Sequence, residues 1–247
     1  MHRGNSESTV KRIFGYMLDA IYPRRCVVCG EISDSPHTNL CVGCKDKLEY
    51  VREPFCLKCG KPLTDEAKPV CDDCLGREHE YIEGRAAFLY NDGMKNAIYG
   101  LKYNNRREYG AYLGEKTAEY LSRKITSWNA DALIPVPIHK SRLQKRGYNQ
   151  ALIIAKAIGK KLQIPVMDGL VVRNKKTKVQ KELTAAEREK NLENAFKMRI
   201  NDVKLNTVIV VDDIYTTGST IDAMARCLHR AGVRNVYYIT VSIGTGR

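Results

Sequence analysis

Two adjacent carboxylates, Asp212 and Asp213, stand between an apolar run and a short segment rich in hydroxyl groups. That segment consists of Thr216, Thr217, Gly218, Ser219 and Thr220. Hydroxyl groups and the free amides at the start of a helix can bind a phosphate, and a glycine lets the backbone approach it. The carboxylates precede this loop, where they could accept hydrogen bonds from the hydroxyls of a sugar. The order predicts a sugar-phosphate site, and a helix cap beside a solvated acid pair is the alternative.

Eight of the nine cysteines form four pairs in which two residues separate the sulfurs. The pairs are Cys26/Cys29, Cys41/Cys44, Cys56/Cys59 and Cys71/Cys74. Four thiolates close a tetrahedral zinc site and leave no position for water, so such a site supports structure rather than catalysis. We expect structural zinc, with two ions favoured over one. Disulfides and redox-active pairs are the alternatives, and a cytoplasmic location disfavours disulfides.

Glycines indicate which cysteine pairs share a metal. Gly30 and Gly60 each follow the second cysteine of a pair, whereas no glycine follows Cys44 or Cys74. The chain therefore repeats a unit of two pairs, and a repeated unit should close on itself. We predict that the first two pairs form one site and the last two pairs another, with a crossed pairing as the alternative.

Strands that alternate with helices must position the acid pair. Candidate strands span Arg85–Tyr90, Ala132–Val136, Val166–Val172, Thr207–Val211 and Val236–Ile243. Candidate helices lie near 94–104, 109–126, 148–162 and 219–231. Apolar strands separated by helices predict an α/β fold with a parallel sheet covered on both faces. Ligands bind beyond the carboxyl ends of such strands, which is where Asp212 and Asp213 follow Thr207–Val211.

The chain is basic, with 41 Lys and Arg against 28 Asp and Glu and a formal net charge of +13. This balance favours an anionic partner such as nucleic acid, membrane lipid or a polyphosphate ligand. No run reaches the roughly 20 apolar residues that a membrane helix needs. The segment 10–21 has helical spacing of its apolar residues, which predicts an amphipathic helix packed on the next module, with a membrane-surface contact as the alternative. A cytoplasmic protein is expected.

The loop that follows the acid pair closely resembles the binding loop for phosphoribosyl pyrophosphate (PRPP) in type I phosphoribosyltransferases. From Pro23 to Ile243 the chain resembles the ComF/ComFC family of competence-associated proteins. The paired ribbons carry this resemblance together with Leu101-Lys102-Tyr103, Ile134-Pro135-Val136-Pro137, Arg146-Gly147-Tyr148-Asn149-Gln150, residues 173–196 and Asp-Asp-x-Tyr-Thr-Thr-Gly. Tyr148 stands where the family usually has phenylalanine, which is a mild change.

The resemblance implies a domain organisation and a set of site residues. An N-terminal helix (1–24) and a double zinc ribbon (25–78) would precede a phosphoribosyltransferase-like domain (80–247). Asp212 and Asp213 would be catalytic and hold the ribose, and residues 216–220 would hold its 5′-phosphate. Pro135, Val136, Pro137, Lys102 and Arg146 would also bind PRPP, with the turn after Ala132–Val136 at the pyrophosphate, and Mg²⁺ would accompany the ligand. A mobile loop would contribute Gln180 and Arg188.

Three functions are consistent with these features. The favoured one is a competence protein that binds single-stranded DNA and takes PRPP, or another ribose phosphate, as its ligand. The second is an active phosphoribosyltransferase that releases pyrophosphate, with an acceptor that the sequence does not reveal. The third is a scaffold whose ribbon docks a DNA-uptake or recombination protein. We expect any hood over the site to come from residues 80–115 and the zinc module.

Overall fold

A four-stranded parallel sheet forms the centre of the computed structural model, which describes residues 23–35, 38–174, 195–199 and 204–245. Its order is β1-β6-β5-β2. The strands are β1 (Gly84–Leu89), β2 (Ala132–Pro135), β5 (Thr207–Tyr215) and β6 (Asn235–Ile243). All three strand pairs are parallel. The predicted α/β class with a parallel sheet is confirmed.

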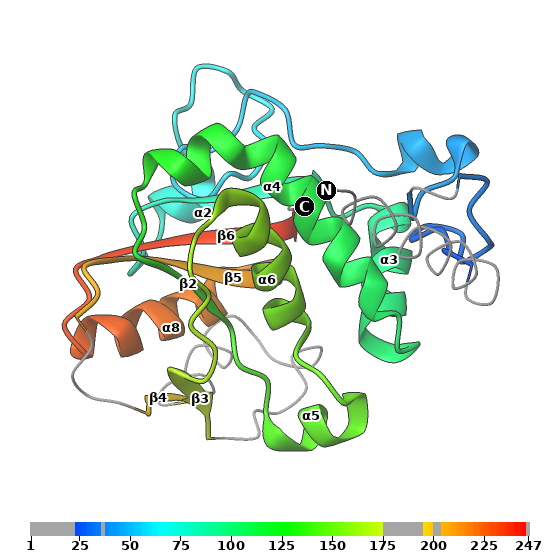
Figure 1. Ribbon diagram of the computed structural model, residues 1–247. Helices are drawn as coiled ribbons and strands as arrows, with labels where there is room; N and C mark the ends of the chain where they lie inside the picture. The colour runs from blue at the N-terminus through cyan, green and yellow to red at the C-terminus, as the bar shows by residue number, and fades with distance from the viewer. Residues whose placement is uncertain (1–22, 36–37, 175–194, 200–203, 246–247) are drawn as a thin grey trace, which may run out of the picture.

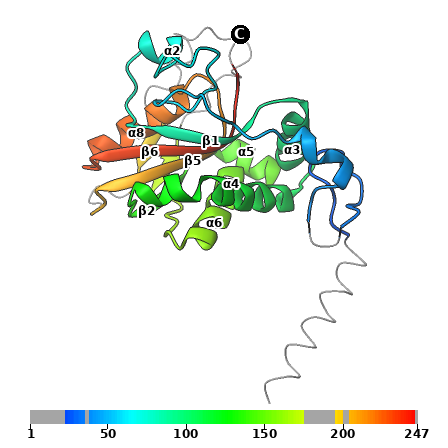
Figure 2. The ribbon, with the colours of Figure 1, turned by 90° about the horizontal axis from the view of Figure 1, so that it is seen from above.

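Helices cover both faces of this sheet (Figures 1 and 2). α4 (Arg107–Ser127) and α6 (Gln150–Leu162) pack against each other on one face, and α8 (Ser219–Arg230) lies on the other. Side chains alternate along β5 accordingly: Ile209 and Val211 join the cluster under α4 and α6, and Val208 and Val210 join the cluster under α8. A strand segment buried on both faces is expected to be apolar, as Val208–Val211 is.

Asparagine side chains cap the N-termini of two of the helices. Asn91 accepts a hydrogen bond from the amide of Met94 at the start of α3 (Asp92–Tyr103). Asn149 accepts one from the amide of Ala151 at the start of α6. Each cap satisfies an amide that has no partner within its helix and so fixes where the helix begins. A short helix that the sequence pattern did not predict, α5 (Lys140–Arg146), lies between β2 and α6.

The prediction of a strand at Val166–Val172 is wrong. Val166 forms only an isolated parallel bridge with Leu133 at the edge of the sheet. The chain then turns at Gly169, whose φ of 79° a strand does not accommodate. The strand that follows is β3 (Val171–Arg173), and it pairs antiparallel with β4 (Phe196–Met198) outside the main sheet.

The strand predicted to end at Val211 continues to Tyr215. Ile214 and Tyr215 pair with Ser242 and Ile243 of β6, so the ladder extends through the acid pair. Asp212 and Asp213 therefore lie within a strand instead of in a loop. Asp213 is buried and Asp212 only partly buried, so the two neighbouring carboxylates have different surroundings.

The cysteine-rich part of the chain, as far as it is described, forms two units that pack on different parts of the sheet domain. η1 (Val42–Lys47) and α2 (Asp72–Leu75) are the short helices of these units. Cys26 and Val27 belong to the apolar cluster of α3 and α4, and Cys56 and Cys59 belong to the cluster of α8. The predicted helix at 1–24 lies almost wholly outside the described residues. Within the described part of the chain, no helix combines the length and apolar character needed to span a membrane.

Candidate ribose-phosphate site

A cavity of about 530 Å³ lies at the carboxyl ends of β2 and β5. Eight of the predicted site residues line it: Lys102, Val136, Pro137, Arg146, Asp212, Asp213, Thr216 and Thr220. They come from the end of α3, the turn after β2, α5, β5, the loop before α8 and the first turn of α8. The position agrees with the rule that open parallel sheets bind ligands beyond the carboxyl ends of their strands.

Other predicted residues lie elsewhere. Pro135 is buried in β2 opposite Val211. Thr217 lines a second cavity, of about 220 Å³, beside the zinc ribbon. Gly218 has a φ of 79°, and a Cβ there would lie 2.6 Å from the hydroxyl oxygen of Tyr215. Glycine is therefore required by the fold itself, independently of any ligand. Ser219 is buried at the start of α8. Gln180 and Arg188 lie outside the described residues.

A buried network holds Asp213. Its carboxylate forms an ion pair with the Nζ of Lys102 and accepts a hydrogen bond of 3.0 Å from Nε2 of Gln150. The guanidinium of Arg146 in turn donates to Oε1 of Gln150. Burial by itself would raise the pKa of Asp213, but the adjacent charge of Lys102 outweighs it and the pKa is lowered. Asp213 is therefore an ionised anchor that joins β5 to three helices.

Asp212 has different surroundings. It is only partly buried, and it lines the cavity. Burial and then the negative charge of Asp213 raise its pKa well above the usual range. The nearby charge of Lys102 lowers this pKa but does not outweigh the burial. A carboxylate in such surroundings can be stabilised by a ligand that donates hydrogen bonds. Of the two acids that line the cavity, Asp212 is the more exposed.

The opposite wall of the cavity is cationic. Arg142, Lys145 and Arg146 of α5 line it together with Arg173 of β3. The mouth also includes Tyr103 and Asn105, from the end of α3 and the turn that follows. Residues within 80–115 thus reach the site as expected, whereas none of the described ribbon residues lines this cavity.

Sequence reasoning did not assign a role to Gln150 or Arg173. Gln150 had a usable signal, because it is a polar residue at the start of an otherwise apolar helix and its side chain is buried. Buried amides need partners, which points to a network. Arg173 begins a basic run that was expected to flank the phosphate site, but its approach to the cavity depends on the turn at Gly169 and the pairing of β3 with β4.

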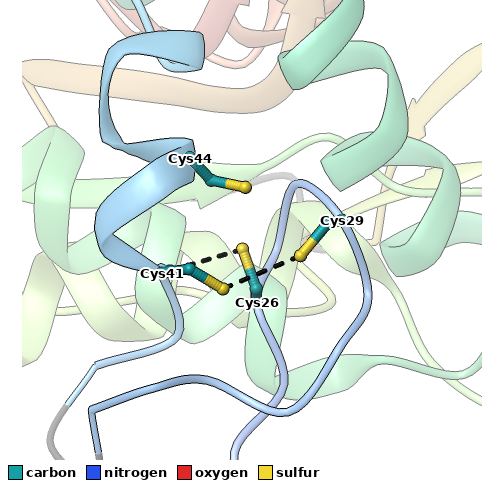
Figure 3. A group of neighbouring side chains, drawn as sticks. All are labelled: Cys26, Cys29, Cys41 and Cys44. Atoms are coloured by element: carbon teal, nitrogen blue, oxygen red, sulfur yellow. Dashed lines mark hydrogen bonds between the residues drawn. The ribbon is translucent and has the colours of Figure 1, made fainter.

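The eight paired cysteines gather into two groups of four, the first of which Figure 3 shows. In each group all four sulfurs lie within 4.8 Å of one another. The Sγ atoms of Cys29 and Cys41 are 3.7 Å apart, as are those of Cys59 and Cys71. A tetrahedron with zinc–sulfur bonds of about 2.3 Å has an edge of about 3.8 Å. The residues fit zinc, the predicted pairing of neighbouring pairs is confirmed, and the crossed pairing is wrong.

Comparisons with known proteins agree with this organisation. Residues 17–75 match the double zinc ribbon domain, and residues 148–243 match the phosphoribosyl transferase domain. The chain is 30% identical to the DNA utilization protein YhgH of Shigella flexneri over 169 residues, which is 67% of this chain and 74% of that protein.

Two further relatives match over a smaller share of their length. Competence protein F of Haemophilus influenzae is 38% identical over 43% of this chain and 47% of its own length. Competence protein ComFC of Bacillus subtilis is 28% identical over 61% of this chain and 59% of its own. The matched stretch thus spans about half of the former protein and more than half of the latter.

We expect the purified chain to hold two zinc ions, because each group of sulfurs is a complete site. Cys29→Ser and Cys56→Ser should each lower the content to about one ion per chain, since a site with three thiolates binds zinc far more weakly. Elemental analysis of the desalted protein measures the content. A wild-type protein that carries disulfides between these cysteines and no zinc would contradict the assignment.

The raised pKa of Asp212 predicts a gain in stability on its removal. A carboxyl whose pKa is raised by folding reduces stability once the pH exceeds its unfolded pKa, and the cost grows until the pH reaches the folded pKa. We expect ligand-free Asp212→Asn to melt roughly 2–4 °C above the wild type at pH 7. The difference should shrink as the pH is lowered. Scanning calorimetry measures it, with the exposed Asp168→Asn as control, and a lower melting temperature at pH 7 would contradict the prediction.

Proposed function

Because this chain belongs to the ComF/ComFC family, which joins a double zinc ribbon to a phosphoribosyltransferase domain, we propose that it binds PRPP or another ribose phosphate and handles single-stranded DNA during DNA uptake. One observation carries the first part. A single cavity joins the carboxylate of Asp212, the hydroxyls of Thr216 and Thr220, and the cations of α5. A ribose phosphate needs this combination, since its hydroxyls donate and its phosphates accept. A cytoplasmic location suits this role and the reduced thiolates of the ribbon.

The ligand would lie with its ribose against Asp212 and its 5′-phosphate at the hydroxyls and amides of residues 216–220. Its pyrophosphate would extend toward Arg142 and Arg146, beyond Pro137. Guanidinium groups bind phosphate oxygens through paired, charge-assisted hydrogen bonds. Lys102 would be held by Asp213 at the floor of the cavity, where its charge offsets that of the two carboxylates. Gln180 and Arg188 would belong to a loop that closes over the ligand.

Mg²⁺ would accompany PRPP, because this ion prefers oxygen ligands and is commonly held by phosphates plus one or two carboxylates. The half-buried carboxylate of Asp212 in a cavity otherwise rich in cations is the group that fits it. When bound, the ion would neutralise charge on the pyrophosphate.

Transfer of the ribosyl group to an acceptor is the second candidate function. The carbon–oxygen bond to pyrophosphate would break as the acceptor attacks the same carbon, and both electrons of the broken bond would leave with pyrophosphate. The chain would contribute by orienting the ribose, neutralising the leaving group with the α5 cations, and excluding water. The intact pair of acids and the cationic wall favour this candidate.

Two exposed tyrosines of α3, one of which lines the cavity, support the part of the proposal that concerns single-stranded DNA. Tyr99 and Tyr103 lie one turn apart on α3, with 58% and 64% of their surface exposed and ring centres 5.0 Å apart. The guanidinium of Arg146 lies 5.7 Å from the ring centre of Tyr103. Proteins that bind single strands without sequence preference combine such stacking surfaces with nearby cations. The relatives named for competence and DNA utilization are consistent with this role.

Ribose-phosphate binding can be tested by calorimetric titration of PRPP with Mg²⁺ into the zinc-loaded protein. We expect saturable binding by the wild type and at least about a tenfold loss in Asp212→Asn, since a hydrogen bond to a charged group contributes about 1.5–3 kcal/mol. The exposed Asp168→Asn should bind as the wild type does. Absence of binding by the wild type would refute this part of the proposal.

Stacking predicts a specific response to substitution of the tyrosines. We expect Tyr99→Leu/Tyr103→Leu to bind an oligothymidylate about 10-fold more weakly or worse, because stacking contributes roughly 1–3 kcal/mol per base. Tyr99→Phe/Tyr103→Phe should retain the affinity. Fluorescence anisotropy over a salt series measures both variants, and the slope with salt should be unchanged because the cations remain. A wild type that fails to bind single strands at low salt would exclude the DNA role.

A further inference from the structure

The loop proposed to hold the 5′-phosphate has a second neighbour, the zinc-ribbon module. Thr216 lines both the large cavity and the cavity of about 220 Å³, whose other walls include Arg77, His79 and Cys59. The loop 216–220 itself contains no basic residue. A phosphate dianion bound there by hydroxyls and amides would therefore need its countercharge from another segment.

Arg77 is the cation closest to the loop hydroxyls in the contacts described. Its NH1 atom lies 3.5 Å from Oγ of Ser219, which is in turn 3.0 Å from Oγ1 of Thr217. The side chain of Arg77 is 24% exposed, so its guanidinium is neither fully buried nor free in solvent. A group bound by the hydroxyls of the loop would lie within reach of this guanidinium.

The segment that carries Arg77 is fixed to the helix that follows the loop. Asp222, in the first turn of α8, accepts from the amide of Glu80 at 3.0 Å, and Nδ1 of His79 lies 3.0 Å from its carboxylate. The side chains of His79 and Asp222 are only 2% and 1% exposed. These bonds join residues that are more than 140 positions apart, so the ribbon and the loop are held in register.

A purely structural role for Arg77, as a partner of Asp222, is the simpler explanation of its position. The distance from its NH2 to Oδ2 of Asp222 is 3.6 Å, longer than the two contacts of 3.0 Å that already satisfy this carboxylate. A guanidinium has five donors, so a contact with one partner does not prevent it from binding an anion as well. Arg77 follows Cys74, the last cysteine of the second cluster, by only three positions. A metal ion bound by that cluster would therefore fix the position of the backbone near Arg77.

We propose that the second zinc ribbon is part of the ribose-phosphate site: Arg77 binds the 5′-phosphate, and the zinc cluster of Cys56, Cys59, Cys71 and Cys74 sets its position. The inference rests on the proposed function and adds a binding residue from outside the phosphoribosyltransferase domain. The two cysteine clusters would then have different roles, because the cluster of Cys26 packs on α3 and α4 and the cluster of Cys56 packs with α8.

The test titrates ribose 5-phosphate and, separately, pyrophosphate into zinc-loaded wild type, Arg77→Gln, Arg77→Lys and the exposed control Arg123→Gln. We expect Arg77→Gln to weaken ribose 5-phosphate binding about 10-fold or more, because it removes a charge-assisted hydrogen bond. Arg77→Lys should recover part of the loss. Pyrophosphate affinity should change less than about twofold, since that group would be bound by α5, and the zinc content should stay at two.

A second comparison tests the metal. Cys74→Ser should weaken ribose 5-phosphate binding more than Cys29→Ser does, although each removes one thiolate from one cluster. Wild-type protein that binds neither ligand would refute the proposed function itself. Wild-type binding of ribose 5-phosphate with equal affinity in Arg77→Gln, or an equal loss of both ligands in that variant, would overturn the inference and leave the proposed function standing.

Discussion

The ion pair between Lys102 and Asp213 lies at the point where the elements of the site meet. Lys102 comes from the end of α3 and Asp213 from the central strand β5, while Gln150 and Arg146 tie the same carboxylate to α6 and α5. A buried carboxylate is costly unless a cation and hydrogen bonds replace its water, and removal of one partner leaves the other charge uncompensated. The shape of the cavity therefore depends on this pair, because the segments that form its walls are held at one carboxylate.

Lys102 forms its ion pair with Asp213, and its charge offsets only part of the cost of burying Asp212 beside it. The two acids are adjacent in sequence and both line the cavity, but Asp213 is buried among its partners whereas Asp212 is only partly buried. Its raised pKa expresses a free-energy cost that a hydrogen-bonding ligand would relieve. Binding sites often contain such a group, because a residue placed to bind a ligand can lower the stability of the ligand-free protein.

The ribbons depend on metal for their own folding and on the sheet domain for burial. Few large apolar side chains lie between the cysteines, so thiolate–zinc bonds must replace the usual core. The second cluster contacts the sheet domain through Tyr238, whose hydroxyl donates to the carbonyl of Cys59 at 2.6 Å. The ring of Tyr238 stacks on that of Tyr215, with the ring centres 4.9 Å apart. Tyr215 directly precedes the phosphate loop. The second metal site is thus continuous with the proposed binding site through a buried stack of aromatic rings.

The sequence by itself determined the parallel α/β fold, the two tetracysteine groups with their pairing, and the strand that delivers the acids. Each of these features follows from local spacing, because apolar runs, Cys-x-x-Cys pairs and repeated glycines can be recognised within a short segment of the sequence. Only the tertiary structure decided that Asp212 and Asp213 differ, that Gln150 joins the network, and that Arg77 meets Ser219. These depend on how distant segments pack, since β5 pairs with β6 through the acid pair and Asp222 holds a segment more than 140 positions away. The failed strand at Val166–Val172 has the same cause, because an apolar run indicates burial but not which partner it pairs with.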